Sequence, residues 1–212
     1  MFLSAKSTEQ MSTRRGLLVF YPDKHMQQIS SADTSSKFDI IWLRFENQYA
    51  PLHFCFYYAP GSHHPDKVQS DFYFELQKGY DKFRGAGDVF FLGDSNVRLG
   101  PLLGDKNIHG KNISSKNKPH FLGFLDYTGM HLLNKIFAYG EPTFEIADRR
   151  KSIIDLGMAS SLHNVLNFKV LPDILGTNIQ TCHKIIVLEM EFSRKTSLHS
   201  KTQYPPTKTT SI

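Results

Sequence analysis

The stretch Val89–Asn96, with the sequence VFFLGDSN, tells most about how this chain folds. Four consecutive large apolar residues followed at once by a glycine predict a short strand that is covered on both faces. A carboxylate and an amide, Asp94 and Asn96, follow where the strand ends and the sheet opens to solvent. The stretch therefore predicts a buried strand that delivers the side chains of Asp94 and Asn96 into one cleft.

Short apolar runs rich in β-branched and aromatic residues recur on both sides of this stretch, and each has the length of a strand. They are Leu17–Tyr21, Ile40–Phe45, Phe54–Tyr58, Ile153–Met158 and Ile185–Met190. Asp66–Phe83 repeats apolar residues every three or four positions, which predicts an amphipathic helix, and a second helix is expected over His120–Asn134. Strands that alternate with helices indicate a layered α/β or α+β domain.

The size and composition of the chain limit the class of protein to which it belongs. Its 212 residues are 40% apolar, so they can bury one sizeable core and form one domain. No apolar run approaches the roughly 20 residues that span a bilayer, and no signal-peptide stretch is evident. We therefore expect an intracellular protein, nuclear or cytoplasmic, without a membrane partner or an obligate protein partner. Two cysteines, Cys55 and Cys182, exclude a disulfide framework.

The formal net charge of +5 is concentrated near the ends of the chain. Residues 193–212 hold four Lys and Arg, no acid and almost nothing to bury. We expect residues 1–15 to be disordered, residues 16–192 to form the domain, and residues 193–212 to be a disordered basic tail. Inside the domain, Asp105–His120 carries four lysines against one acid, which predicts a basic loop that could follow phosphates.

Polar groups also stand at other strand ends. Asp155 lies in an apolar run, where an unpaired carboxylate would cost several kcal/mol unless it meets a metal ion, a histidine or another hydrogen-bond donor. His183 precedes the last apolar run, and Tyr58 closes an earlier one. Carboxylates, an imidazole and amide or phenol donors at one edge of a sheet are the groups that metal-assisted hydrolysis of a phosphate ester requires.

Each of these residues also has a structural explanation when it is taken singly. Asp94 could cap a turn, Asn96 could be a left-handed turn residue, and His183 could be a satisfied surface imidazole. A thiol nucleophile made of Cys182 and His183 is not expected, because adjacent residues on a strand point to opposite faces. The order of the motifs is therefore more specific than any one of them.

The motifs FYYAP, a helix, FFLGDSN, PTF, SIID and TCH follow one another before a last apolar strand. This order resembles the endonuclease/exonuclease/phosphatase superfamily, above all the endonuclease domains of non-long-terminal-repeat retrotransposons, over about Gly16–Met190. The resemblance implies a four-layered α/β sandwich of two mixed β-sheets with helices outside. It also implies a site for Mg²⁺ or Mn²⁺ that acts on nucleic acid, DNA above all.

The resemblance implies a role for five residues at this site. Asp94 would orient or deprotonate the attacking water, and Asn96 would hydrogen-bond the phosphate. Tyr58 would contact the phosphate, Asp155 would lie near the metal ion or the phosphate, and His183 would act on the scissile phosphate. Asp155 and Asp94 are therefore the expected metal ligands.

Two further positions are expected at the substrate-facing surface. Thr143 belongs to PTF, which resembles a Thr-Trp element of the superfamily with Phe in place of Trp. Asn117, within SKNK, stands where related domains often have an Asn-rich loop before a helix. Both would contact the substrate.

The sequence departs from the superfamily's pattern in two places. The match begins at RRGLLVFY, so the chain resembles an N-terminally truncated copy that lacks the first strands and the Glu that is the principal metal ligand. Cys182 stands where the family usually has the Asp that orients the imidazole of His183. The missing Glu predicts weak metal binding, with Glu46 and Glu145 as the nearest replacement acids. The two departures together predict weak or absent Mg²⁺-dependent nuclease activity.

Two functions follow from these observations. The first is a divalent-metal-dependent phosphodiesterase, a DNA endonuclease derived from a retrotransposon. The alternative is a catalytically dead relic of such an element, or a nucleic-acid-binding fragment without turnover. The sequence feature that separates the two functions is the missing Glu strand, which favours the relic.

Overall fold

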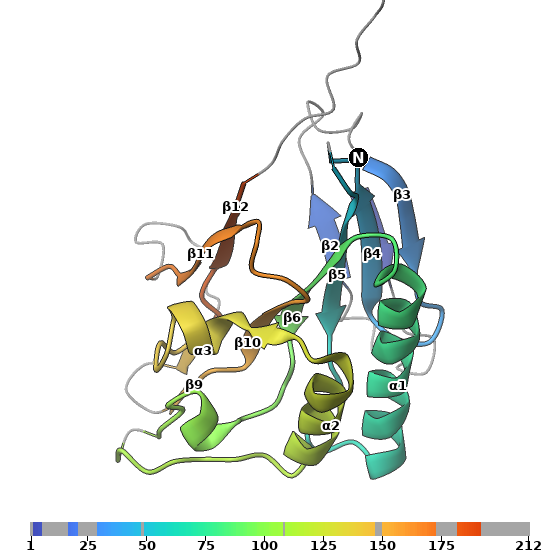
Figure 1. Cartoon of the computed structure of the whole chain (residues 1–212). Coiled ribbons are helices and arrows are strands. Elements are labelled where there is room, and N and C mark those ends of the chain that lie inside the picture. Colours follow the sequence, from blue (N-terminus) through green and yellow to red (C-terminus); the bar gives the residue numbers. More distant parts are fainter. Residues whose placement is uncertain are drawn as a thin grey trace, which may run out of the picture.

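A six-stranded mixed sheet forms the centre of the fold (Figure 1). The computed structural model describes residues 2–5, 17–20, 29–47, 49–107, 109–146, 150–172 and 182–191. In spatial order, the strands of the sheet are β3 (Ile29–Thr34), β4 (Ile40–Phe45), β5 (Leu52–Tyr58), β6 (Asp88–Asp94), β10 (Asp155–Ala159) and β7 (His131–Leu132). β5 and β6 are parallel, and the other neighbours are antiparallel. Because a parallel connection must cross over the sheet, helix α1 (Asp66–Phe83) joins β5 to β6.

The helices α1 and α2 (Lys118–Thr128) cover one face of this sheet. Phe72 and Leu76 of α1, one turn apart, share a buried cluster with Tyr57 and Phe91 of the sheet. Full burial of one such side chain contributes roughly 1.5–3 kcal/mol, so this contact between helix and sheet is a main source of stability. No helix in the described part of the chain is both long enough and apolar enough to cross a membrane.

Smaller elements cover the opposite face of the sheet. They are α3 (Leu133–Phe137), the antiparallel pair of β11 (Val165–Val170) and β12 (Ile186–Met190), and the antiparallel pair of β1 (Phe2–Ala5) and β2 (Leu17–Phe20). Phe168 of β11 and Phe90 of β6 belong to one buried cluster, and Leu17 of β2 packs against the cluster around Ile41 of β4. Helices, central sheet and paired strands are stacked in layers, which confirms the α/β sandwich class. Among the described residues, the strands outside the central sheet form three separate antiparallel pairs and not one mixed sheet.

Local sequence patterns predict several of these elements well. The structure confirms a helix over Asp66–Phe83 and a strand over Ile40–Phe45 with the predicted bounds. The helix expected over His120–Asn134 ends at Thr128, because Gly129 takes the left-handed conformation with φ 63°. The chain then continues as β7 and α3.

Residues 2–5 were expected to be disordered but form β1, because the backbone of β2 offers them a pairing edge that composition does not show. Residues 6–16 and the basic tail expected over residues 193–212 lie outside the described residues. The boundaries of the domain stay a prediction.

The glycine of the GDSN motif is required by a close backbone approach. A Cβ atom at Gly93 would lie 1.9 Å from the carbonyl oxygen of Tyr57 on the neighbouring strand β5. Any other residue would push β5 and β6 apart at their ends. The spacing between Tyr58 and Asp94, the last residues of these strands, therefore depends on this glycine.

A buried histidine in β5 makes the stability of the fold depend on pH. His53 is 1% exposed and stacks on Phe83 with ring centroids 4.7 Å apart, and its Nδ1 has no hydrogen-bond partner in the described part of the chain. Burial, with the charge of Arg44 second, lowers the pKa of His53 below its usual value of 6.5. The unfolded chain therefore takes up this proton at a higher pH than the folded chain does, so the contribution of neutral His53 to stability is full above pH 6.5 and falls as the pH drops below it.

We expect the free energy of unfolding, measured in urea, to lose up to about 1 kcal/mol per pH unit through this group below its unfolded pKa. A His53→Phe variant keeps the stacking on Phe83 and should lose that part of the slope. The exposed His131→Gln serves as the control and should keep it. An unchanged slope in His53→Phe would show that the folded chain protonates His53 as readily as the unfolded chain.

Candidate metal and phosphate site

Three neighbouring strands of the central sheet place polar side chains in one row. Tyr58 at the end of β5 pairs with Asp94 at the end of β6, and Asp94 pairs with Asp155 at the start of β10. Because side chains alternate along a strand, Asp94 shares the face of Phe90, which is the face opposite α1 and α2. The register thus sets Tyr58, Asp94 and Asp155 side by side at one edge of the sheet, between the layers.

His183 joins this row from the C-terminal part of the chain. It forms a β-bridge with Phe144 of β8 (Phe144–Ile146), and its Nδ1 lies 3.0 and 3.1 Å from the two carboxylate oxygens of Asp155. The hydrogen bond to Asp155 raises the pKa of His183, and the negative charges of Asp155 and Asp94 add to this effect against the opposing effect of burial. The prediction that Asp155 has a partner is confirmed, and the partner is an imidazole.

The expectation that His183 lacks an orienting carboxylate is wrong. Cys182, its neighbour in sequence, is exposed, and its carbonyl oxygen accepts the N–H of Glu145 at 2.8 Å. Asp155, 28 residues earlier, holds Nδ1 of the imidazole instead. The orienting group therefore comes from another strand and not from the adjacent residue.

The carboxylate of Asp94 is held in a position where its negative charge is costly. Burial and, second, the charge of Asp155 raise the pKa of Asp94 to about 6, although the N–H of Asn96 and the nearby His183 favour its ionised form. One ligand atom from each of Asp94, Asp155 and His183 lies within 4.8 Å of the other two. Two facing carboxylates of this kind fit a hard divalent cation, which prefers oxygen ligands and would relieve their repulsion.

Asn96 adopts a strained backbone conformation, with φ 47°. Its N–H donates to Oδ1 of Asp94 at 2.8 Å, and its Nδ2 donates to the carbonyl oxygen of Ala59 at 2.8 Å. The turn before it is held by the N–H of Ser95, which donates to the carbonyl oxygen of Ile154 at 2.8 Å. Such strain costs about 1–3 kcal/mol. Here the hydrogen bonds of Asn96 and Ser95 hold the turn in this conformation. Asn96 is therefore both a left-handed turn residue and part of the site.

One pocket of about 360 Å³ opens at this row of residues. Among the side chains that line it are Tyr58, Asp94, Asn96, Arg98, Phe144 and His183. The prediction that Asp94 and Asn96 reach one cleft is confirmed, and Tyr58 and His183 share it. Asp155 contributes through its contact with His183. Four of the five predicted catalytic side chains thus line the pocket, and the fifth supports it.

The two positions expected at the substrate-facing surface are buried instead. Thr143 is 0% exposed, and its Oγ1 accepts the N–H groups of Ile154 and Asp155 at 3.0 and 2.9 Å. Asn117 is 3% exposed, and its Nδ2 lies 3.4 Å from the carbonyl oxygen of Asn96. The expectation of substrate contact is therefore wrong for both residues. Through these hydrogen bonds, Thr143 and Asn117 hold the backbone beneath Asp155 and Asn96.

The acids proposed as replacement metal ligands do not reach the cluster. Glu145 is engaged by Lys151 at 2.6 Å and by Lys184 at 2.9 Å, and these ammonium groups lower its pKa. Glu46 pairs with Arg44 at 3.1 Å. Among the described residues, the cluster therefore has two carboxylates and one imidazole.

Sequence reasoning missed Arg98 and Ser115, which also line the pocket. A usable signal was present for Arg98, because it stands two residues after Asn96 just as Asn96 stands two residues after Asp94. Ser115 comes from the loop before α2, and no local pattern places it beside β6.

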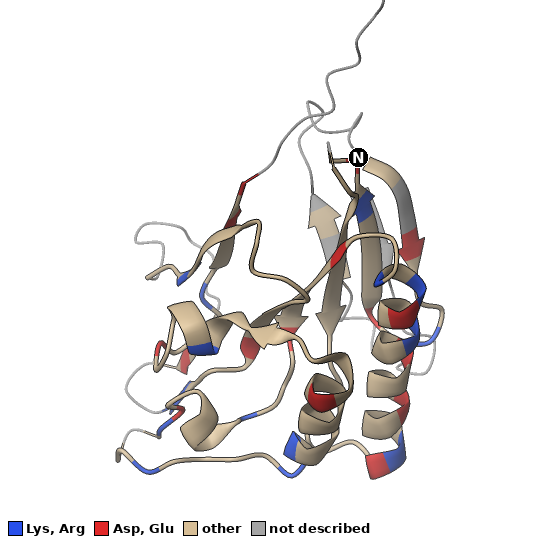
Figure 2. Cartoon of the chain, in the orientation of Figure 1, with Lys and Arg blue, Asp and Glu red and all other residues tan. Residues whose placement is uncertain are grey.

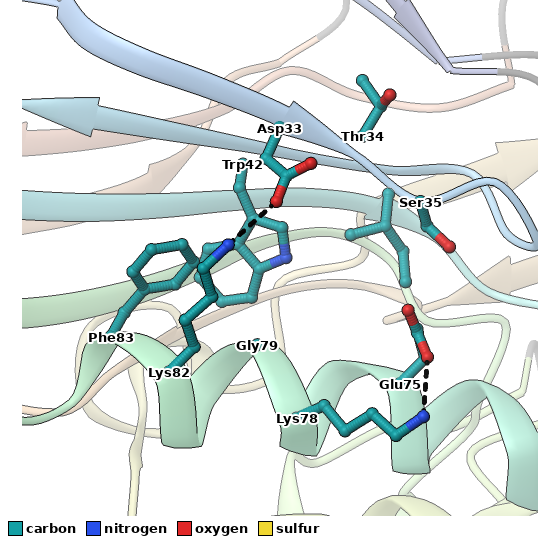
Figure 3. Close-up of a pocket in the computed structure, with 10 residues that line it drawn as sticks. Asp33, Thr34, Ser35, Trp42, Glu75, Lys78, Gly79, Lys82 and Phe83 are labelled. Atoms are coloured by element: carbon teal, nitrogen blue, oxygen red, sulfur yellow. Dashed lines mark hydrogen bonds and ion pairs between the residues drawn. The ribbon is translucent and has the colours of Figure 1, made fainter.

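A second pocket, of about 200 Å³, lies between β3 and α1 (Figure 3). Its floor contains the rings of Trp42 and Phe83, whose centroids are 4.8 Å apart. Its rim holds two ion pairs, Asp33 with Lys82 at 3.0 Å and Glu75 with Lys78 at 3.5 Å. Its charged groups are thus paired with one another and none of its described lining residues is a histidine, so the catalytic candidates are at the first pocket.

Comparisons with known proteins agree with this architecture. No family model matches the sequence, and no curated protein matches it. The fold is similar to the endonuclease domain of TRAS1, a telomere-specific non-LTR retrotransposon, with a TM-score of 0.64 and 16% identity over 91% of this chain and 81% of that chain.

Two further solved structures share the fold. The 3′ phosphatase NExo from Neisseria, bound to a product DNA hairpin, has a TM-score of 0.60 and 12% identity over 76% of this chain and 67% of that chain. An endonuclease/exonuclease/phosphatase family protein from Leptotrichia buccalis has a TM-score of 0.50 and 13% identity over 77% of this chain and 62% of that chain. This chain therefore has the fold of the endonuclease/exonuclease/phosphatase superfamily, as the sequence motifs predict.

Proposed function

We propose that this chain is a divalent-metal-dependent phosphodiesterase that cleaves nucleic acid, with DNA as the expected substrate. The observation that carries the proposal is the cluster of Asp94, Asp155 and His183 within 4.8 Å, beside the pocket that Asn96 also lines. The shared fold supports the reaction class. The likeness to a retrotransposon endonuclease domain and to a phosphatase bound to DNA supports DNA as substrate and a retrotransposon origin.

The carboxylates of Asp94 and Asp155 would hold the cation, for which Mg²⁺ or Mn²⁺ is expected. When bound, such a cation neutralises charge on the phosphate oxygens and favours deprotonation of water. The two carboxylates that the described cluster offers predict modest affinity for a strongly hydrated cation.

The side chains of this site have distinct tasks in the proposed reaction. The Asp94 carboxylate orients the attacking water and accepts its proton. The Asn96 amide and the Tyr58 phenol donate to phosphate oxygens as charge develops on them. Asp155 holds Nδ1 of His183, which fixes the ring and stabilises its protonated form, so the imidazolium can act on the scissile phosphate.

The surroundings of the pocket favour a polyanionic substrate. Basic residues mark the loop that leads into α2, along the lower edge of Figure 2. They are Lys106, Lys111, Lys116 and Lys118. The guanidinium of Arg150, another lining residue, lies 5.8 Å from the ring centre of Phe144. A basic loop and an arginine beside the cluster suit a phosphodiester backbone. For an enzyme that acts on DNA, the expected location is the nucleus or the cytoplasm.

The proposal is tested by the nicking of supercoiled plasmid with Mg²⁺ or Mn²⁺ and with EDTA. We expect cleavage only with the divalent cation, and Asp94→Asn should reduce the rate at least about a hundredfold, because it removes both a proton acceptor and a ligand charge. Asp126→Asn, an exposed residue on α2, is the matched control and should leave the rate unchanged.

The same experiment separates the two functions that the sequence allows. Salt-dependent DNA binding without any cleavage would support a nucleic-acid-binding relic and overturn the enzyme. Cleavage that persists in EDTA would overturn the metal dependence.

A further inference from the structure

Arg98 is almost buried beside the proposed catalytic cluster and lines its pocket. It is 9% exposed. Its Nε and Nη2 donate to the two carboxylate oxygens of Asp105 at 3.0 and 2.8 Å, and Nη2 also donates to the carbonyl oxygen of Lys151 at 2.6 Å. Asp105 is 1% exposed, so this carboxylate holds one edge of the guanidinium in a fixed plane.

The third guanidinium nitrogen of Arg98, Nη1, has N–H groups that these bonds do not use. A guanidinium has five N–H groups, and the bonds to Asp105 and Lys151 use those of Nε and Nη2. Nη1 has no partner among the described residues, yet it is not one of the unpaired atoms that are sealed from solvent. Because Arg98 is otherwise buried, the pocket that it lines is where Nη1 meets solvent.

Ser115 adds a second donor on the same wall of the pocket. Its Oγ accepts the backbone N–H of Arg98 at 2.7 Å, and its backbone N–H donates to the carbonyl oxygen of Arg98 at 3.0 Å. These bonds leave the hydroxyl hydrogen of Ser115 without an acceptor among the described residues. Asp94 is the one carboxylate among the described lining residues. The carboxylate of Asp105 is buried behind Arg98 and does not line the pocket, so this wall presents N–H and O–H donors to it.

The position of Arg98 in the chain indicates what these donors would bind. It stands two residues after Asn96, so the Cα atoms of the two residues are no more than about 7 Å apart. A purely structural arginine would need only its bonds to Asp105 and Lys151. The unused edge of a preorganised guanidinium is suited to a phosphate oxygen.

We propose that Nη1 of Arg98 and the hydroxyl of Ser115 bind a phosphate that neighbours the scissile one in the substrate chain. The inference rests on the proposed function and deepens it, because it names the substrate class. The preferred substrate is a polynucleotide with at least two consecutive phosphates, and an isolated phosphodiester is a poor one.

The test compares the dinucleotide TpT, which has one phosphodiester and no second phosphate, with the tetranucleotide TpTpTpT. The wild-type chain should cleave the tetranucleotide with a kcat/KM at least about tenfold higher, as expected for one charge-assisted contact. Arg98→Lys should remove most of this preference, because one ammonium cannot both hold Asp105 and donate into the pocket. Ser115→Ala should reduce the preference by a smaller factor.

Controls separate a binding role from a structural one. Arg98→Met alone would leave Asp105 buried without a partner, so it is paired with Asp105→Leu, and circular dichroism checks the fold of each variant. Lys78→Met, in the second pocket, should keep the preference for the tetranucleotide. Equal losses on both substrates in the Arg98 variants would mean that the residue only supports the fold and would overturn the proposal.

A binding measurement decides the question without turnover. Binding of fluorescein-labelled TpTpTpT is measured against salt concentration in EDTA, and Arg98→Lys should lower the log–log slope by about 0.7, the value for one single-strand phosphate. An unchanged slope overturns the phosphate contact. If the wild-type chain cleaves neither substrate, the proposed function is wrong, and the salt dependence of binding alone tests whether Arg98 contacts a phosphate. If it cleaves both substrates equally well, only the proposed phosphate subsite is wrong.

Discussion

Replacing His183 by alanine should lower kcat for phosphodiester cleavage by about a thousandfold, with little change in KM. The imidazole is held by Asp155 at 3.0 Å and lines the pocket, so its loss removes a group that acts on the reacting phosphate. Single-turnover cleavage of a labelled oligonucleotide with Mn²⁺ measures the effect on the chemical step. A variant that keeps a tenth or more of the wild-type rate would remove His183 from the proposed machinery.

The contact between His183 and Asp155 can be tested with single and double variants. Asp155→Asn should also cost a large factor, and the double variant should be little worse than either single variant, because the two side chains act as a unit. Cys182→Asp should raise the cleavage rate little above that of the wild-type chain, since Asp155 already holds Nδ1 of the imidazole. Additive losses would show that Asp155 and His183 work independently.

Thr143→Val should destabilise the fold by about 2–4 kcal/mol, although it keeps the volume of the side chain. The Thr143 hydroxyl accepts the N–H groups of Ile154 and Asp155, and valine would leave both donors without an acceptor in the interior. Each buried donor without a partner costs about 1–3 kcal/mol. Urea unfolding measures the loss.

Thr143→Ser is the matched control, because it keeps the hydroxyl and removes one methyl group. It should cost about 1 kcal/mol. Cleavage by Thr143→Val should also fall, since the backbone that carries Asp155 is no longer held. Equal stability of the valine and serine variants would show that water or another group satisfies the two N–H groups.

The parts of the fold that the sequence predicts are those with a strong local pattern. The apolar period of Asp66–Phe83 and the apolar run of Ile40–Phe45 are readable without any partner. β3, with the sequence ISSADT, is mostly polar and is a strand because β4 pairs with it. Propensity cannot reveal a strand of this kind.

The candidate site shows the same division between local and distant information. Asp94 and Asn96 stand at the end of one apolar run, so the sequence alone places them in a cleft. The contact between Asp155 and His183 joins residues 28 positions apart, and the sequence pointed to the neighbour of His183 instead. The burial of Thr143 depends on how β10 meets the hairpin of β8 and β9 (Arg150–Ser152), and no pattern within PTF indicates it.

The row of Tyr58, Asp94 and Asp155 has a consequence for how the gene can vary. The three residues occupy paired positions on β5, β6 and β10. The site therefore depends on which face of the sheet each strand position points to. Deleting one residue within Asp88–Asp94 would turn every following side chain of the strand to the other face, and the Asp94 carboxylate would point toward the helices. Insertions and deletions in the turn at residues 84–87 leave that orientation intact. Length variation compatible with the site should therefore accumulate in the turns, and strand length should stay constant.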